Sequence, residues 1–132
     1  MTRHVDFLAQ LYRVWGVVFG IVAAAGLALA GGAWAIARVS GPVEATGTQM
    51  AAGVTAVMMA VLAATALLWA ALHLWVGAGL RRHQPRSRLL ALGLAIGNLP
   101  LLPFGTALGA YACWVLLHDD GRTVFVPPAP TP

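Results

Sequence analysis

The chain has 132 residues, enough for one domain, and 60% of them are apolar while only 9% are charged. Soluble domains carry roughly 25% charged residues, and a soluble domain of this size buries only about two thirds of the surface that its unfolded chain exposes. A lipid bilayer accepts apolar side chains directly, so this composition excludes an ordinary soluble domain and predicts an integral membrane protein.

The net charge is +4, and all eight basic residues are arginines. They collect at the ends of apolar runs, which is typical of membrane topology signals rather than of nucleic-acid binding. The single cysteine, Cys113, lies inside an apolar run, so the chain offers neither a disulfide framework nor a cysteine-rich metal site. We therefore expect the lipid bilayer as a partner and no nucleic acid.

The first apolar run extends from Val14 to Ala37, between Arg13 and Arg38. It is long enough to cross a hydrocarbon core of about 30 Å at 1.5 Å per residue. Residues 39–49 are rich in Gly, Pro, Ser and Thr, which predicts a loop. A second apolar run follows at about 50–76.

The region from Leu89 to Leu117 is apolar but is interrupted by Asn98, Pro100 and Pro103. Proline removes a backbone hydrogen bond from a helix and clashes with its preceding turn, so a tight turn between two short helices is predicted. Each helix falls at or below the roughly 17 residues of a full span, so tilt, a thinner bilayer or incomplete crossing must compensate. The alternative is one long kinked helix, giving three spans. The predicted fold is an all-α bundle of four transmembrane helices in a single domain of residues 1–123, with spans at about 14–37, 50–76, 89–99 and 102–118.

The segment 124–132 holds four prolines and is predicted to be extended and disordered. The first apolar run could instead be a cleaved leader, because Ala33-Trp34-Ala35 resembles a cleavage site. Its apolar core is longer than the roughly 7–15 residues of a leader, and Asp6 lies ahead of it, so a retained span is favoured.

Arginines are concentrated on one side of the predicted bundle. Arg3 and Arg13 precede the first run, and four arginines lie within 81–88. The first loop has a single arginine, Arg38, and the turn at Asn98 has no arginine. The positive-inside rule therefore places the N-terminus, the arginine-rich segment and the C-terminus in the cytoplasm.

Small residues recur at four-residue spacing along the predicted helices. Lipid supplies no hydrophobic drive for helix association, so small residues that allow close backbone approach are typical of helix contacts in membranes. The contacts could lie within the chain, between copies of it or with another membrane protein. The predicted helix-packing residues are Gly16, Gly20, Ala24, Ala28, Gly32, Ala52, Ala56, Ala60, Ala64, Gly93, Gly97, Gly105 and Gly109.

The four acidic residues, Asp6, Glu44, Asp119 and Asp120, all lie outside the predicted spans. Ion-coupled transport usually needs a carboxylate inside the membrane. Small four-helix multidrug exporters have a glutamate in the first span, and this chain has no ionisable residue there. We expect no catalytic residue, no metal site and no enzyme activity.

His73 and His118 lie near the inner ends of their predicted helices. Two imidazoles at matching depth could ligate a haem iron axially. The favoured interpretation is that both are interfacial residues whose polar edges reach headgroup water, so no cofactor is expected. Asn98 is interpreted as a turn former before Pro100, with a hydrogen-bonding or substrate group at a broken helix as the alternative.

Residues 103–117 read Pro-Phe-Gly-Thr-Ala-Leu-Gly-Ala-Tyr-Ala-Cys-Trp-Val-Leu-Leu and are followed by Asp119, Asp120 and Phe125. This segment resembles the C-terminal signature of small multi-pass bacterial membrane proteins, in which a Gly-Thr-x-x-Gly-x-Tyr-x-x-Trp helix leads into acidic and then aromatic residues. The match covers about a fifth of the chain, and Cys113 stands where an aliphatic residue is expected. The resemblance implies a bacterial inner membrane, four spans and cytoplasmic ends, and it brings no activity.

These observations predict a non-catalytic membrane protein, an accessory or scaffold subunit that packs against other membrane helices or against itself through its Gly/Ala faces. The alternative function is that of a redox-associated membrane protein that binds haem or quinone near the inner leaflet.

Overall fold

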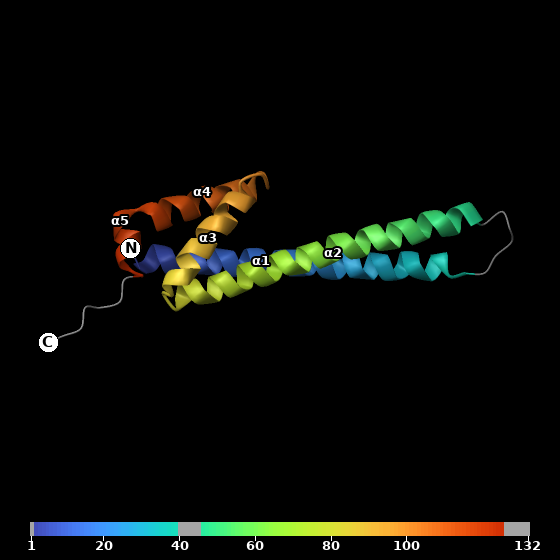
Figure 1. Ribbon diagram of the computed structural model, residues 1–132, viewed down its shortest axis with the longest axis horizontal. Helices are drawn as coiled ribbons and strands as arrows, with labels where there is room; N and C mark the ends of the chain where they lie inside the picture. Colours follow the sequence, from blue (N-terminus) through green and yellow to red (C-terminus); the bar gives the residue numbers. More distant parts are fainter. Residues whose placement is uncertain (1, 40–45, 126–132) are drawn as a thin grey trace. The chain divides into compact units, whose positions relative to one another are not determined.

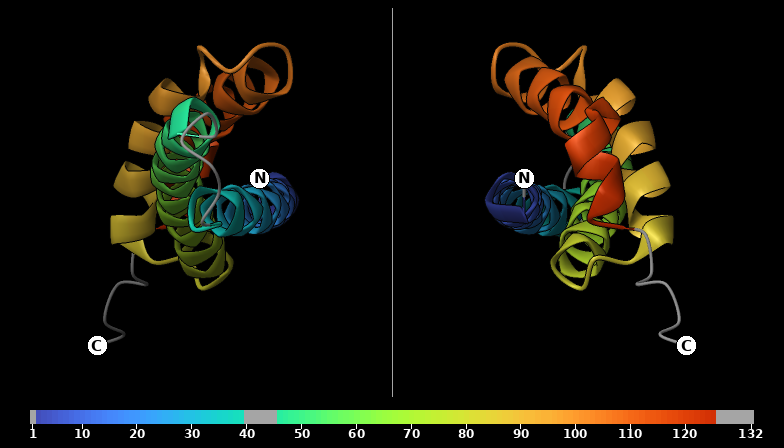
Figure 2. Two further views of the ribbon diagram at one scale, coloured as in Figure 1. Left: turned by 90° about the vertical axis from the view of Figure 1, so that its right-hand side faces the viewer. Right: turned by 90° about the vertical axis from the view of Figure 1, so that its left-hand side faces the viewer.

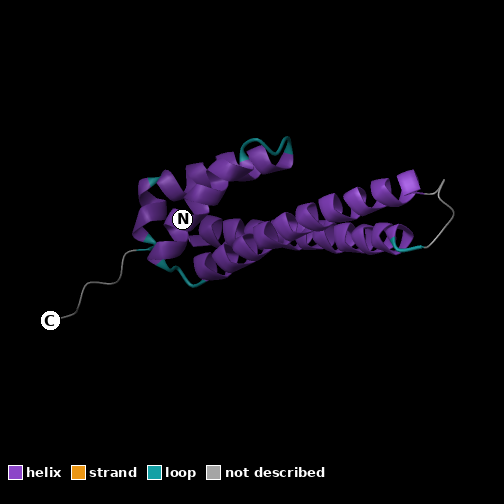
Figure 3. Cartoon of the chain, turned by 45° about the vertical axis from the view of Figure 1, so that its right-hand side comes forward, coloured by secondary structure: helices purple, strands orange, loops and turns teal. Residues whose placement is uncertain are grey.

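The computed structural model describes residues 2–39 and 46–125, and all regular structure in these ranges is helical (Figure 3). Part of the predicted loop at 39–49 and most of the predicted tail at 124–132 lie outside the described residues. The all-α prediction is confirmed for the described ranges, whose helices (Figure 1) are α1 (Thr2–Ala37), α2 (Thr46–Arg81), α3 (Pro85–Asn98), α4 (Phe104–Leu117) and α5 (Asp119–Thr123).

Helix α1 begins at Thr2, well before the predicted start at Val14. The reason is an amphipathic pattern in residues 2–13 that a search for unbroken apolar runs misses. Apolar positions separated by three and four residues fall on one face of a helix, and here they are buried while the polar residues between them are exposed. The buried positions are Val5, Leu8, Ala9 and Tyr12.

The chain divides into two compact units. Unit 1 comprises residues 1–16 and 72–132, and so contains the first turns of α1, the last turns of α2, and α3 to α5. Unit 2 comprises residues 17–71 and contains the remaining parts of α1 and α2. The two units are compact parts of the chain and are not assigned as separate domains. The single domain predicted for residues 1–123 stays a prediction.

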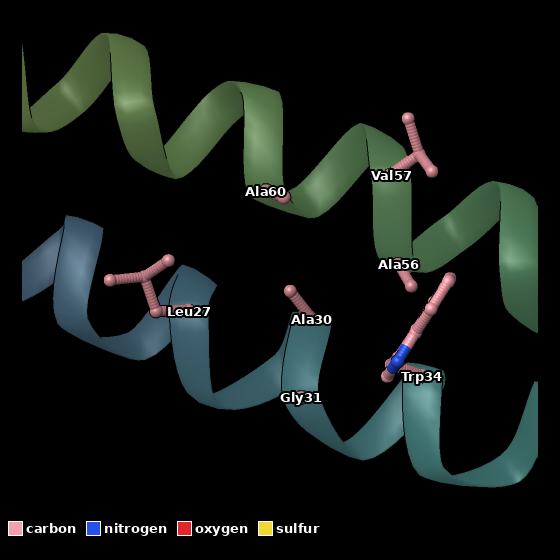
Figure 4. Close-up of a pocket in the computed structure, with 7 residues that line it drawn as sticks. All are labelled: Leu27, Ala30, Gly31, Trp34, Ala56, Val57 and Ala60. Carbon is pink, nitrogen blue, oxygen red and sulfur yellow. The ribbon is translucent and has the colours of Figure 1, made fainter.

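In unit 2, α1 and α2 are antiparallel and pack through small residues (Figure 4). A Cβ atom placed on Gly26 would lie 3.1 Å from Cβ of Ala63, and one placed on Gly53 would lie 3.9 Å from Cβ of Ala37. The positions that are buried or half-buried recur along each helix at spacings that alternate between three and four residues, as in helices that pack along a common seam. These seam positions are Phe19, Ala23, Gly26, Ala30, Ala33 and Ala37 on α1, and Ala52, Ala56, Met59, Ala63, Ala66 and Ala70 on α2.

The small side chains of this seam leave an apolar recess of about 390 Å³ between the two helices. In Figure 4, Ala30 and Ala56 point toward the opposite helix, whereas Val57 points away from it. The ring of Trp34 lies beside Ala56 at the edge of the recess. Apart from the ring of Trp34, the lining of the recess consists of aliphatic side chains and a glycine.

In unit 1, α3 and α4 are separate helices that pack against each other (Figure 2), rather than one long kinked helix. Two glycines of α4 allow this close approach. A Cβ atom on Gly105 would lie 2.6 Å from the carbonyl oxygen of Asn98, and one on Gly109 would lie 2.5 Å from that of Ala95. Both distances are shorter than a real side chain tolerates, so larger residues would separate the helices.

Helix α2 ends in a Schellman motif, in which two backbone N–H groups beyond the helix satisfy its last free carbonyls. The N–H of Gln84 donates to the oxygen of Gly79 at 3.1 Å, and that of His83 donates to the oxygen of Leu80 at 3.0 Å. His83 has a φ of 51°, where glycine is usual. Pro85 then begins α3, a position that suits its missing N–H.

Helices α1 and α2 are each 36 residues long. Each contains an 18-residue window with a mean hydropathy of 2.1, and 17% of that window is buried. By length and composition, two of the described helices can therefore cross a membrane. Helices α3 and α4 have 14 residues each. That is about 21 Å at 1.5 Å per residue, short of the roughly 30 Å of a hydrocarbon core. Four spans stay a prediction.

Candidate functional site

A buried polar cluster lies in unit 1, where α1, α2 and α3 meet. Its members are Tyr12, Trp15, His73 and Asn98. Tyr12 and Trp15 are one turn apart on α1, His73 belongs to α2, and Asn98 is the last residue of α3. Tyr12, His73 and Asn98 have no exposed surface, and Trp15 is half-buried. Polar groups in such surroundings are costly unless they have hydrogen-bond partners.

Tyr12 connects α1 to two other helices. Its hydroxyl donates to the carbonyl oxygen of Ala91 on α3 at 2.7 Å. Its ring stacks on the imidazole of His73, with 5.4 Å between centroids and 23° between planes. The side chain therefore fills core volume and satisfies its one polar atom at the same time.

Asn98 connects the other two members. Its Oδ1 accepts a hydrogen bond from Nε1 of Trp15 at 3.2 Å, and its Nδ2 lies 2.9 Å from Nε2 of His73. An indole N–H can only donate, so the atom of Asn98 that faces Trp15 must be its oxygen. The amide nitrogen then faces His73 and donates, and Nε2 of His73 accepts. His73 is thus held as the neutral tautomer with its proton on Nδ1.

The polar atoms of the cluster are used in contacts between helices. The hydroxyl of Tyr12, the amide of Asn98 and Nε2 of His73 all face protein groups. None of the three side chains has surface through which a substrate would touch it. The cluster therefore fixes the C-terminal end of α3 against α1 and α2.

The interpretation of His73 as an interfacial residue is wrong, because its side chain is fully buried against Tyr12 and Asn98. His118 lies in a different environment. It follows α4, is exposed, and its ring centroid is 6.2 Å from that of Trp114. Axial ligation of haem through Nε2 of His73 would require the hydrogen bond from Asn98 to break. Asn98 both ends α3 and bonds to two other helices, so its hydrogen-bonding interpretation is correct alongside its place before the turn.

A second group of aromatic residues ties the first turns of α1 to α4. Nδ1 of His4 lies 3.1 Å from the hydroxyl of Tyr111, and the His4 ring meets Trp114 edge-on at 5.7 Å between centroids. Phe7 meets Tyr111 in the same edge-on way at 6.0 Å. These contacts explain why α1 continues to Thr2 as an ordered helix, although its first turns are too polar for a membrane span.

The predicted helix-packing residues fall into different environments. Two that lie on α4, Gly105 and Gly109, contact α3 directly. The predicted positions on α1 are spaced four residues apart and form one ridge. The α1–α2 seam of unit 2 has spacings that alternate between three and four residues. The ridge and the seam therefore lie on different faces of α1. A role for the exposed positions in contacts with another chain stays a prediction. Gly16, Ala56, Gly105 and Gly109 are buried, Gly20 and Ala52 are half-buried, and Ala24, Ala28, Gly32, Ala60, Ala64, Gly93 and Gly97 are exposed.

Tyr12 and Trp15 were not predicted as site residues. The local signal was available, because the amphipathic spacing of residues 2–13 places Tyr12 on the buried face. The partners were not predictable in the same way, since Trp15 and Asn98 are separated by 83 residues and Asn98 and His73 by 25.

Among residues 2–39 and 46–125, no group of three or more His, Cys, Asp or Glu side chains is placed to hold a metal ion. Cys113 is half-buried and forms no disulfide. No known protein family, curated protein or solved structure matches the chain.

Proposed function

We propose that this chain is a non-catalytic, multi-pass protein of the bacterial inner membrane that acts as an accessory or scaffold subunit for other membrane helices. The observation that carries the proposal is the low burial of its most apolar helices. The hydrophobic windows of α1 and α2 are 17% buried, whereas the core helix of a soluble protein would be mostly covered. Large exposed apolar faces mark sites of contact with a membrane or with another protein.

A structural role is supported by the use made of the polar residues. Within the described ranges, His73 and Asn98 bond to each other in the core of unit 1. The acidic side chains of Asp6, Asp119 and Asp120 are exposed. Catalysis or coupled transport in a bilayer calls for ionisable groups facing the bundle interior or a water-filled path. The cluster instead joins helices, as a scaffold requires.

A partner helix is supported by the exposed part of the α1 ridge. Ala24, Ala28 and Gly32 are exposed, and a Cβ atom on Gly20 or Gly32 would meet no other atom within 4 Å. Small residues at four-residue spacing allow two helix backbones to approach closely. Because the α1–α2 seam of unit 2 uses other positions, this ridge is available to a second membrane protein or a second copy.

For the topology, we propose that α1 and α2 cross the bilayer and that α3 and α4 form a hairpin entering and leaving from the cytoplasmic side. Each hairpin helix is too short for a full crossing. The end of α3 bonds to Trp15, close to the start of the apolar run at Val14. This depth favours a shallow hairpin over the four full spans predicted from sequence, and both arrangements keep the N- and C-termini in the cytoplasm.

Labelling of single cysteines distinguishes the two topologies. In a Cys113→Ser background, Thr48→Cys should react with a membrane-impermeant maleimide added outside the cell, and Leu102→Cys should not. If both positions react from outside, α3 and α4 are full spans and the hairpin is wrong. A C-terminal reporter fusion should report the cytoplasm, and a periplasmic result would overturn both topologies.

Site-specific photocrosslinking tests the scaffold role. A photoreactive residue at Ala28, on the exposed ridge, should give a discrete adduct with one membrane protein or with a second copy. The same residue at Val57, which points away from the seam, is the control and should give lipid adducts only. Lipid adducts alone at both positions would overturn the scaffold role. Haem absorption in the visible spectrum of the purified protein would instead favour the redox alternative.

A further inference from the structure

We propose that unit 1 binds an anionic phospholipid, with an acyl chain in a groove between α2 and α3 and the phosphate beside Arg82 and Arg86. This inference rests on the proposed membrane location. It concerns one ligand site within unit 1 and is independent of the partner helix proposed for α1.

The groove is apolar and open. It has a volume of about 250 Å³, and two of its side chains, Trp75 and Leu89, are 65% and 70% exposed. A Cβ atom on Gly93 would meet no other atom within 4 Å, so the space beside this glycine is unfilled. The lining residues are Leu72, Trp75, Val76, Leu89, Leu90, Gly93 and Leu94.

Two arginines lie at the α2–α3 turn, beyond one end of the groove-lining segments. Arg82 directly follows the end of α2 at Arg81, and Arg86 precedes Gly93 by seven residues, about two turns of α3. Both side chains are exposed. Neither has an ion pair or a hydrogen bond in the part of the chain that the structure describes. By contrast, Nε of Arg88 donates to the carbonyl oxygen of Leu116 at 3.1 Å, so this arginine binds to the end of α4.

Positive charge predominates at this turn, where Asp6 of α1 lies 3.6 Å from Nε2 of His83. The first turn of α3 contains Arg86 and Arg88 and no acidic residue, although the positive end of the helix dipole favours anions there. Arg81 and Arg82 add positive charge from the end of α2. A phosphate diester between these groups would relieve the repulsion and accept hydrogen bonds from a guanidinium.

The combination of groove and arginines favours a lipid over a free anion. A free phosphate would use only the arginines and would leave Trp75 and Leu89 exposed. A phospholipid covers both surfaces, because its acyl chains are joined to its phosphate through the short glycerol backbone. The turn also lies on the side of the membrane assigned to the cytoplasm, where clusters of arginine beside a membrane helix attract anionic lipids.

Lipid titration of the full-length protein in phosphatidylcholine nanodiscs tests the charged part of the site. With increasing phosphatidylglycerol, wild-type protein should retain bound phosphatidylglycerol, detected by native mass spectrometry. The double variant Arg82→Gln/Arg86→Gln should bind phosphatidylglycerol about thirtyfold more weakly, because each basic residue near a membrane surface contributes to the affinity for anionic lipid and two are removed. The control Arg3→Gln/Arg38→Gln removes the same charge elsewhere and should change the affinity less than about threefold. An equal loss in both double variants would overturn the site.

Filling the groove tests the apolar part. Gly93→Leu should exclude the acyl chain and lower phosphatidylglycerol affinity about tenfold, since an isobutyl group occupies the unfilled space. Gly97→Leu, exposed on α3 but outside the groove, is the matched control and should bind like wild type. Glycerophosphoglycerol, the headgroup without acyl chains, should bind far more weakly than the lipid. Equal binding of headgroup and lipid, or no effect of Gly93→Leu, would show that the groove has no role.

The same samples separate this inference from the proposed membrane location. If wild-type protein inserts into nanodiscs but does not prefer phosphatidylglycerol to phosphatidylcholine, the lipid site is wrong and the membrane location stands. If wild-type protein does not insert at all, the membrane location is wrong, and the lipid site falls with it.

Discussion

The indole N–H of Trp15 donates to Oδ1 of Asn98 at 3.2 Å, and this bond determines the direction of the hydrogen bonds in the buried cluster of unit 1. With its oxygen held by Trp15, Asn98 must donate to His73. The end of α3 is thereby joined to α1 and α2 by one side chain. The consequences for stability can be tested by single substitutions.

Asn98→Ala should destabilise the protein by about 1–3 kcal/mol, because it leaves buried hydrogen-bonding groups of Trp15 and His73 without their partner. Thermal unfolding in detergent, followed by tryptophan fluorescence, measures the change. Thr65→Ala is the control, since the Thr65 hydroxyl is exposed and bonds only to Val61 in its own helix. Equal midpoints for the two variants would show that the cluster does not hold the helices together.

Gly109→Ala should destabilise the α3–α4 hairpin by about 1–3 kcal/mol, the usual cost of overpacking. The added methyl group would lie 2.5 Å from the carbonyl oxygen of Ala95, so the backbones must move apart. Gly93→Ala, on the partner helix of the same hairpin, meets no atom within 4 Å. It should stabilise the protein by up to about 1 kcal/mol through helix propensity. Opposite signs in a denaturant titration are the expected result, and a shared sign would contradict the observed packing.

Ala63→Leu should separate α1 from α2 in unit 2. Ala63 is 2% exposed and packs against Gly26, where no larger side chain fits, so a cost of about 1–3 kcal/mol is expected. Its neighbour Ala64 is exposed, and Ala64→Leu should change the free energy of unfolding by less than about 0.5 kcal/mol. Detergent unfolding of the two variants side by side measures the difference. A larger effect at Ala64 would place the seam on the four-residue ridge.

His83→Gly should stabilise the α2–α3 turn. A φ of 51° costs a non-glycine residue about 1–2 kcal/mol, and glycine removes that cost. The variant loses a 3.6 Å contact between His83 and Asp6 and an edge-on contact between the His83 ring and Phe125. Both contacts are near the surface and should offset only part of the gain. Gln84→Gly is the control, since Gln84 has an ordinary φ of −73° and gains nothing from glycine. A lower thermal midpoint for His83→Gly than for wild type would contradict the strain argument.

Several features followed from the amino-acid sequence because they depend on local chemistry. Helical structure in the long apolar runs of α1 and α2 follows from their composition. The break between α3 and α4 follows from Pro100 and Pro103, since proline cannot continue a helix without losing a hydrogen bond. The amphipathic start of α1 was also within reach of the sequence, because its spacing of three and four residues is a local pattern.

Only the tertiary structure decided which faces meet. The four-residue ridge of α1 and the alternating seam through Ala23 and Ala30 are both rows of small residues, so composition cannot choose between them. The choice depends on how the two helices wrap along each other, which places Gly26 against Ala63. The buried cluster depended in the same way on long-range contacts, because Trp15 and Asn98 are 83 residues apart. Hydrogen bonds between such distant residues form only once packing brings their helices together, and no local pattern records them.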